Sequence, residues 1–222
     1  MNSKHVFSHA EYTLTGDVSI PAVLRIGAYE TPVWNQQGWN SGEFSAFVNK
    51  NGCGHCCVAM AARLHGVCID PHEEFVRCRA LWGAPAGDQG PWLSAAGVAK
   101  VLRSLQVPAE AFGVKEQGTK QAAEHILCAL REGRQVIFTS NPERDPENPF
   151  SKGYHWVMAV AVREDGAVLI ANSSGKAAPD GMQIVLPQTV EKALFCEAMA
   201  PEDMTWGETE RIHEGSGYII VG

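Results

Sequence analysis

The segment Asn51-Gly52-Cys53-Gly54-His55-Cys56-Cys57 carries the strongest structural signal in the 222-residue sequence. Apolar residues continue at helical spacing from this segment to Gly66, which predicts that a loop turns into a helix near Cys53. At a helix start, unpaired backbone N–H groups and the positive end of the helix dipole stabilise an anion. We therefore expect the pKa of the Cys53 thiol to be lowered and its sulfur to be a nucleophile. The flanking glycines would let an incoming molecule approach closely.

Downstream of this segment, the hydrophobic pattern changes from helical to strand-like. Two more helices are predicted, around Val98 to Leu105 and from Thr119 to Gly133. Short apolar runs then predict strands at Gln135 to Thr139, His155 to Val162, Ala167 to Ala171, Met182 to Leu186 and Tyr218 to Val221.

The order of these elements predicts the fold class. Helices come first and strands follow, which indicates one α+β domain over residues 1–222 rather than a doubly wound sheet. In this domain an N-terminal helical part, with Cys53 at a helix start, would pack on an antiparallel sheet. Residues 1–32 give no clear pattern and remain an unassigned lead-in.

Composition and charge exclude several classes of function. Hydrophobic residues make up 45% and charged residues 19% of the chain, and the formal net charge is −7. Because the 18 Lys and Arg residues are scattered, we expect no nucleic-acid partner and no anionic membrane partner. No apolar run approaches a bilayer span and no signal peptide is visible. This predicts a cytoplasmic location, or secretion if a leader has been removed from this chain.

The seven cysteines are an odd number, and without a visible secretory signal they predict reduced thiols rather than a disulfide framework. Free cysteines usually serve as small buried hydrophobes, and we expect this of Cys68, Cys78, Cys128 and Cys196. Cys53 differs from them because it stands between two glycines.

A nucleophilic thiol needs a neighbouring base, and His155 is the candidate. It begins a strongly apolar predicted strand, where a rigid imidazole at the edge of the core can still meet a ligand. His55 is closer to Cys53 in sequence, but helix side chains two residues apart do not face each other. The segment Ser140 to Gly153 before His155 holds three prolines and five charged residues. We expect it to be a mobile loop outside the core, suited to act as a lid.

The base in turn needs an acceptor that fixes its tautomer, and Asn172 at the end of the next predicted strand is the candidate. A four-residue turn over Arg163 to Gly166 would place Asn172 opposite Val157, one diagonal step from His155. A two-residue turn would place it opposite Ala159, beyond direct hydrogen-bond reach unless a bulge intervenes. The sequence leaves both turns open.

With a cysteine, a histidine and an asparagine now in order, the chain resembles the C39-like branch of the papain-like cysteine peptidases. The segment Asn51 to Met60 looks like that family's Ser-Gly-Cys-Gly-Pro-Thr-Ser-x-Ala-Met, with the nucleophile at Cys53. Gly153 to Met158 is similar to the family's Gly-Gly-His-Phe-x-Val, and Ala171 to Ser174 is similar to the stretch that holds its third catalytic residue. The resemblance extends over most of the chain.

The resemblance also implies a role for a residue upstream of the cysteine. Val33-Trp34-Asn35-Gln36 is similar to the family's aromatic-Asn-Gln stretch, whose glutamine side chain helps to form the oxyanion hole. This implies the same role for Gln36, with Gln37 as the substitute if the register differs by one residue.

What the resemblance implies is a papain-like fold and a cysteine peptidase or amide hydrolase with a Cys53, His155 and Asn172 triad and a thioester acyl-enzyme. A peptide or protein substrate is implied, with no metal and no organic cofactor. The chain departs from the family where His55-Cys56-Cys57 replaces Pro-Thr-Ser and Ser173-Ser174 replaces Asp-Pro. The third catalytic residue is therefore Asn172 or a neighbour, and the substrate preference and oligomeric state stay open.

The same residues allow rival interpretations. Cys53-Gly54-His55-Cys56 has the form found in protein disulfide isomerases, which would make the chain a thiol–disulfide oxidoreductase with Cys56 as the resolving thiol. That motif should follow a hydrophobic strand, whereas Val48 to Gly52 is polar. Cys53, Cys56 and His155 are a possible zinc ligand set, although no second paired ligand motif appears. The residues also fit an acyltransferase or a catalytically silent binding module on the same fold.

Overall fold

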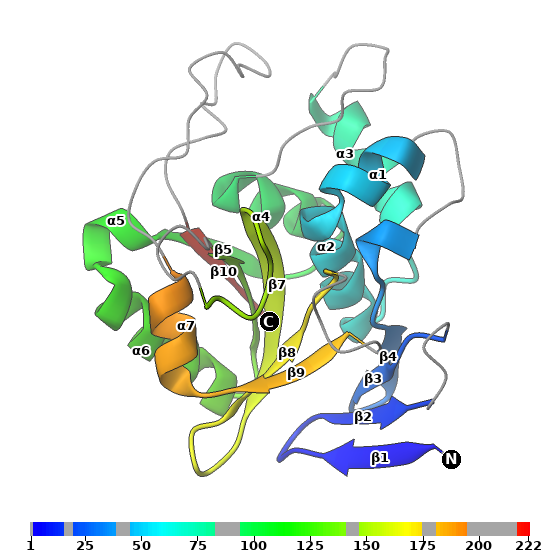
Figure 1. Cartoon of the computed structure of the whole chain (residues 1–222). Helices are drawn as coiled ribbons and strands as arrows, with labels where there is room; N and C mark the ends of the chain where they lie inside the picture. Colours follow the sequence, from blue (N-terminus) through cyan, green and yellow to red (C-terminus); the bar gives the residue numbers. More distant parts are fainter. Residues whose placement is uncertain are drawn as a thin grey trace.

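The computed structural model describes residues 2–15, 20–38, 45–82, 94–140, 147–174, 181–194 and 217–222. These residues form two antiparallel sheets and the helices that pack around them (Figure 1). The α+β class predicted from the sequence is confirmed. Within the described ranges, no helix is both long enough and apolar enough to span a bilayer.

The N-terminal lead-in is a four-stranded sheet with strand order β1-β2-β3-β4. Its strands are β1 Ser3–Val6, β2 Glu11–Leu14, β3 Val23–Ile26 and β4 Tyr29–Pro32. The lead-in that the sequence left unassigned is therefore made of strands, and these precede the helical part. Strands β2, β3 and β4 each bury a single residue and β1 buries none, so no alternating pattern could be recognised in them.

The larger sheet has six strands in the order β5-β10-β6-β7-β8-β9. Its strands are β5 Ala109–Gly113, β6 Gln135–Ser140, β7 His155–Val162, β8 Val168–Ala171, β9 Met182–Val185 and β10 Gly217–Val221. The helices are the 3-10 turn η1 Gln36–Gly38, α1 Ser45–Asn51, α2 Cys53–Leu64, α3 Pro71–Trp82, α4 Ala95–Ser104, α5 Val114–Gln117, α6 Thr119–Arg131 and α7 Pro187–Ala193. All the helices and strands predicted from hydrophobic spacing are present among them.

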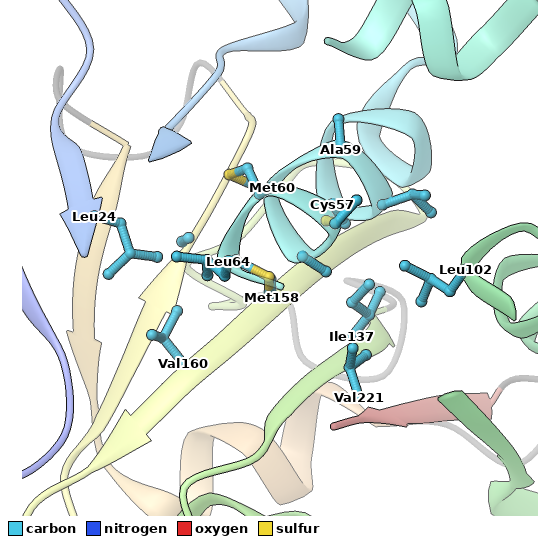
Figure 2. Close-up of a cluster of buried hydrophobic side chains, with 14 of the residues drawn as sticks. Leu24, Cys57, Ala59, Met60, Leu64, Leu102, Ile137, Met158, Val160 and Val221 are labelled. Atoms are coloured by element: carbon cyan, nitrogen blue, oxygen red, sulfur yellow. The ribbon is translucent and has the colours of Figure 1, made fainter. Parts of the chain in front are cut away.

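Helices cover both faces of the six-stranded sheet. One face packs on α2, α4 and the smaller sheet, through residues that include Met158 of β7 and Ile137 of β6 (Figure 2). The other face packs on α6 and α7, through residues that include Val157 of β7 and Phe138 of β6. Because alternate residues enter two different cores, every residue of β7 is buried.

Helix α2 is buried on all sides, since Arg63 is its only residue that is not buried. The structure also corrects the predicted loop before it, because α1 extends to Asn51 and only Gly52 separates the two helices. The backbone N–H of Gly52 donates to the carbonyl of Val48 at 2.7 Å. This tight junction between α1 and α2 fixes the position of the Cys53 backbone at the start of α2.

The β7–β8 hairpin differs from both of the predicted turns. Five residues, 163–167, connect the paired strands, and a β-bulge farther along β7 shifts the register by one residue. Asn172 directly follows β8, and the shifted register continued by one residue sets it beside Val157. The four-residue turn is absent. However, the bulge offsets the extra residue in the observed turn, so Asn172 still lies where a four-residue turn would have placed it.

The α1–α2 junction leaves no room for a side chain at Gly52. A Cβ there would lie 2.3 Å from the carbonyl oxygen of Val48 and 2.6 Å from its Cγ1. We expect Gly52→Ala to lower the free energy of unfolding by about 1–3 kcal/mol, because the two helices must separate to accept the methyl group. Urea denaturation measures this, with Gly153→Ala as the control because a Cβ at Gly153 meets nothing within 4 Å. Equal stability of the two variants would contradict the argument.

Candidate active site

Cys53 is the first residue of α2 and borders a pocket of about 260 Å³. Only 9% of its surface is exposed. Backbone hydrogen bonds from Trp156, Gly54 and Cys53 itself favour the thiolate, but the stronger effect of burial raises the pKa of the Cys53 thiol. The prediction of a lowered pKa is therefore wrong, because desolvation outweighs the helix start.

His155 is the first residue of β7 and borders the same pocket. Its Nε2 lies 2.8 Å from Oδ1 of Asn172, and both side chains are almost fully buried. Burial lowers the pKa of His155 to about 4, and the hydrogen bond to Asn172 offsets only part of that effect. Because the His155 pKa is lowered and the Cys53 pKa is raised, both groups are neutral at pH 7.

The hydrogen bonds of Asn172 fix the tautomer of His155. The Asn172 Nδ2 group donates to the carbonyl of Phe150 at 3.0 Å and to Oε1 of Gln183 at 2.8 Å. Its Oδ1 accepts from the backbone N–H of Ser174 at 2.9 Å. With both amide protons donated, Oδ1 must face the imidazole, so the imidazole proton lies on Nε2. The Nδ1 atom of His155 therefore keeps a free lone pair, as a base requires.

Gln183 and Phe150 were not identified from the sequence, although both accept hydrogen bonds from Asn172 and hold its side chain in place. Gln183 is a polar residue within β9, and its Nε2 donates to the carbonyl of Pro149 at 3.2 Å. The available signal was a lone polar residue inside a predicted strand. A lone polar residue in a strand does not identify its partner, because the contact between the side chains of Gln183 and Asn172 joins two separate segments of the chain.

The segment before β7 is only partly the loop that was predicted. Phe150 is fully buried and contacts Phe138 of β6, with ring centroids 5.9 Å apart, so this part of the segment belongs to the core. Ser140 belongs to β6, while Ser151 and Gly153 border the pocket. Residues 141–146 of the predicted loop lie outside the described residues.

Gln36 lines the same pocket as Cys53. Its backbone N–H donates to the carbonyl of Ser173 at 3.0 Å, and its Nε2 donates to the carbonyl of Lys50 at 3.2 Å. The carbonyl of Lys50 can only accept, so it fixes which side of the Gln36 amide carries Nε2. The second N–H of Nε2 remains for another acceptor. Gln37 also borders the pocket, but its side chain is exposed while Gln36 is buried.

The structure thus brings Gln36, Cys53 and His155 to one pocket, with Asn172 behind the histidine. The pocket is lined by Gln36, Gln37, Lys50, Asn51, Cys53, Gly54, His55, Ser151, Gly153, Tyr154, His155, Trp156 and Ser174. These residues come from η1, the end of α1, the start of α2, the approach to β7 and the segment after β8. The site therefore depends on contacts between segments far apart in the sequence.

The other cysteines and His55 differ in part from expectation. His55 bonds Glu74 of α3, with Nδ1 2.5 Å from Oε2. The described cysteines are free thiols, among them Cys53 and Cys56. Cys78 is buried as expected, but Cys68 and Cys128 are exposed, because one lies in the loop after α2 and the other on the outer side of α6. Cys196 lies outside the described residues.

The predicted redox and zinc sites lack their expected surroundings. The Cys53-to-Cys56 motif follows helix α1 instead of the hydrophobic strand expected in a disulfide oxidoreductase. Within the described residues, the ligand atoms of Cys53, Cys56 and His155 do not form a group close enough to share a metal ion.

Comparisons with known proteins give similarities of fold only. The chain matches no protein-family model and no curated protein. Among solved structures, it is similar to a protein described as a C39-like peptidase from Bacillus anthracis, with a TM-score of 0.47, 14% identity and coverage of 78% of this chain and 89% of the other. It is also similar to a double-glycine-motif protease from an AMS/PCAT transporter in complex with the leader peptide, with a TM-score of 0.41, 13% identity and coverage of 76% and 83%.

The neutral state of the pair predicts how Cys53 reacts with iodoacetamide. We expect Cys53 to be alkylated more slowly than the exposed Cys128 at neutral pH, and faster as the pH rises, because burial raises the Cys53 pKa. Peptide mass spectrometry of one sample measures both rates between about pH 5 and pH 9. A rapid, pH-independent alkylation of Cys53 at acid pH that is lost in His155→Ala would contradict this state and establish a preformed ion pair.

Proposed function

We propose that this chain is a cysteine hydrolase of peptide or amide bonds, with Cys53 as nucleophile, His155 as base and Asn172 as the residue that orients the base. The observation that carries the proposal is the hydrogen-bond set of Asn172, which leaves the lone pair of His155 on Nδ1 at the pocket that Cys53 borders. A neutral imidazole with this tautomer can accept the proton of a thiol. The resemblance to C39-like peptidases supports the same assignment.

In the first step, Sγ of Cys53 attacks the carbonyl carbon while its proton passes to Nδ1 of His155. Proton transfer during attack makes a preformed thiolate unnecessary, which agrees with the raised pKa of Cys53 and the lowered pKa of His155. The imidazolium that forms donates from Nε2 to Oδ1 of Asn172, and this hydrogen bond becomes stronger when the donor is charged.

The oxyanion of the tetrahedral intermediate needs donors on the other side of the carbonyl. We assign this role to the second Nε2–H of Gln36 and the backbone N–H of Cys53. His155 then gives its proton to the leaving amine, which breaks the C–N bond and leaves a thioester on Cys53. Water attacks this thioester with His155 again as base, and the acid and the free thiol are released.

The nucleophile and base can be tested without knowledge of the substrate. We expect a peptidyl epoxide of the papain-inhibitor type to alkylate Cys53 selectively, and we expect Cys53→Ala and His155→Ala to abolish the mass increase. Thermal denaturation controls for folding, and Cys56→Ala is the matched control because it changes a buried thiol one turn along α2. Labelling that persists in His155→Ala, together with a Cys53–Cys56 disulfide in the isolated protein, would overturn the proposal.

The two adjacent glutamines provide a second test. We expect Gln36→Ala to lower kcat by about 10²–10³-fold, because it removes an oxyanion donor, and Gln37→Ala to have little effect. The measurement is the rate of cleavage of a peptide library, followed by mass spectrometry, at enzyme concentrations matched by active-site titration. The opposite order of the two variants would assign the role to Gln37, and equal activity of all three proteins would remove the side chain from the mechanism.

A further inference from the structure

A second group of chemically reactive side chains lies between α2 and α3, outside the proposed mechanism. It consists of His55, Glu74 and Cys78, whose ligand atoms all lie within 4.8 Å of one another. His55 is 1% exposed, and the other two are completely buried. Figure 1 shows α3 beside α1 and α2, and α2 and α3 are in contact.

The sequence of α3 explains why two of these groups face α2. Glu74 and Cys78 are four residues apart on one helix, so their side chains share one face. The neighbouring carboxylate, Glu73, is used differently: its Oε2 accepts from the backbone N–H of Asp70 at 3.0 Å, while Asp70 Oδ1 accepts from the Glu73 N–H at 2.8 Å. This reciprocal capping fixes the first turn of α3 and leaves Glu74 turned inward.

The hydrogen bonds of this group are incomplete. Nδ1 of His55 lies 2.5 Å from Oε2 of Glu74, but the second carboxylate oxygen, Oε1, is buried and has no hydrogen-bond partner among the described residues. Burial of a carboxylate oxygen without a partner is costly. The ring of Phe75 meets the imidazole edge to face, with centroids 5.0 Å apart, which restricts how His55 can turn. A cation between the three residues would satisfy the remaining oxygen.

The donor set indicates which cation fits. An imidazole nitrogen, a carboxylate oxygen and a thiol sulfur together suit Zn²⁺, whereas Ca²⁺ and Mg²⁺ prefer sites made of oxygen alone. We propose that His55 Nδ1, the carboxylate of Glu74 and the sulfur of Cys78 bind a divalent transition-metal ion of the zinc type. Binding displaces the proton between His55 and Glu74 and the proton of Cys78 to solvent, so that three protein ligands hold the ion.

This ion would join the first turn of α2 to α3. His55 lies two residues after Cys53 and also borders the pocket, so the ion would hold the helix turn that carries the candidate nucleophile. The site does not depend on the proposed hydrolase activity. Its ligands also differ from the Cys53, Cys56 and His155 set predicted from the sequence.

The test uses Co²⁺ and Zn²⁺ as probes, in a Cys53→Ala background that removes the pocket thiol as a competing ligand. We expect one equivalent of Co²⁺ to give a sulfur-to-cobalt charge-transfer band and the visible absorption of a tetrahedral site. Cys78→Ser should abolish the charge-transfer band, and Glu74→Gln should weaken Co²⁺ binding by more than the about 10–100-fold that loss of an outer-shell partner costs. Cys128→Ser and Cys56→Ala are controls, and both should retain the band.

A second measurement does not depend on a variant in the cluster. X-ray absorption of the Zn²⁺-loaded Cys53→Ala protein should resolve one sulfur ligand together with nitrogen or oxygen ligands. Zn²⁺ should also raise the melting temperature of this protein and not that of its Cys78→Ser derivative. The absence of stoichiometric binding in the Cys53→Ala protein, or a charge-transfer band that survives Cys78→Ser, would overturn the proposal. Either result would leave the hydrolase proposal unaffected.

Discussion

The complete burial of α2 is the constraint on which the rest of the structure depends. A helix that is apolar on all sides must be covered on all sides. Strand β7 covers one side, α3 and α4 cover others, and β4 of the smaller sheet contacts it as well. The N-terminal sheet is therefore part of the core around the helix, even though its own strands bury little. Because α2 is packed against elements on several sides, its first turn and Cys53 are held beside the start of β7.

That fixed position has an electrostatic consequence. The burial that holds Cys53 and His155 in place also removes water from both, and this opposes a charge on either side chain. The protein compensates through polar groups that are already oriented, since Asn172 uses all four of its hydrogen-bonding positions and Gln36 is held by the backbone of Lys50. Such preorganised groups are most effective where charge develops during a reaction.

The parts that could be predicted from the sequence are those with a local signal. Cys53, His155 and Asn172 each stand at the boundary of an element with a clear period, and the structure places them at those boundaries. The smaller sheet gave no such signal because its strands bury one residue or none. Gln183, Phe150 and Glu74 act through contacts between distant segments, which no local pattern encodes. The sequence left two hairpin turns open and neither is present, but a bulge and a longer turn together set Asn172 at the position that the four-residue turn would have given.

The first turn of α2 thus has polar partners on both sides. Toward the sheet, the backbone of Trp156, the residue after His155, acts to lower the pKa of the Cys53 thiol, against the larger effect of burial. Toward α3, His55 bonds the buried carboxylate of Glu74, one oxygen of which has no partner within the described part of the chain. A helix buried by apolar contacts alone can still rotate or slide by small amounts, whereas directional bonds on opposite sides fix its rotation. Because His55 lies two residues after Cys53, its bond to Glu74 connects the turn that carries the candidate nucleophile to α3 as well as to the sheet.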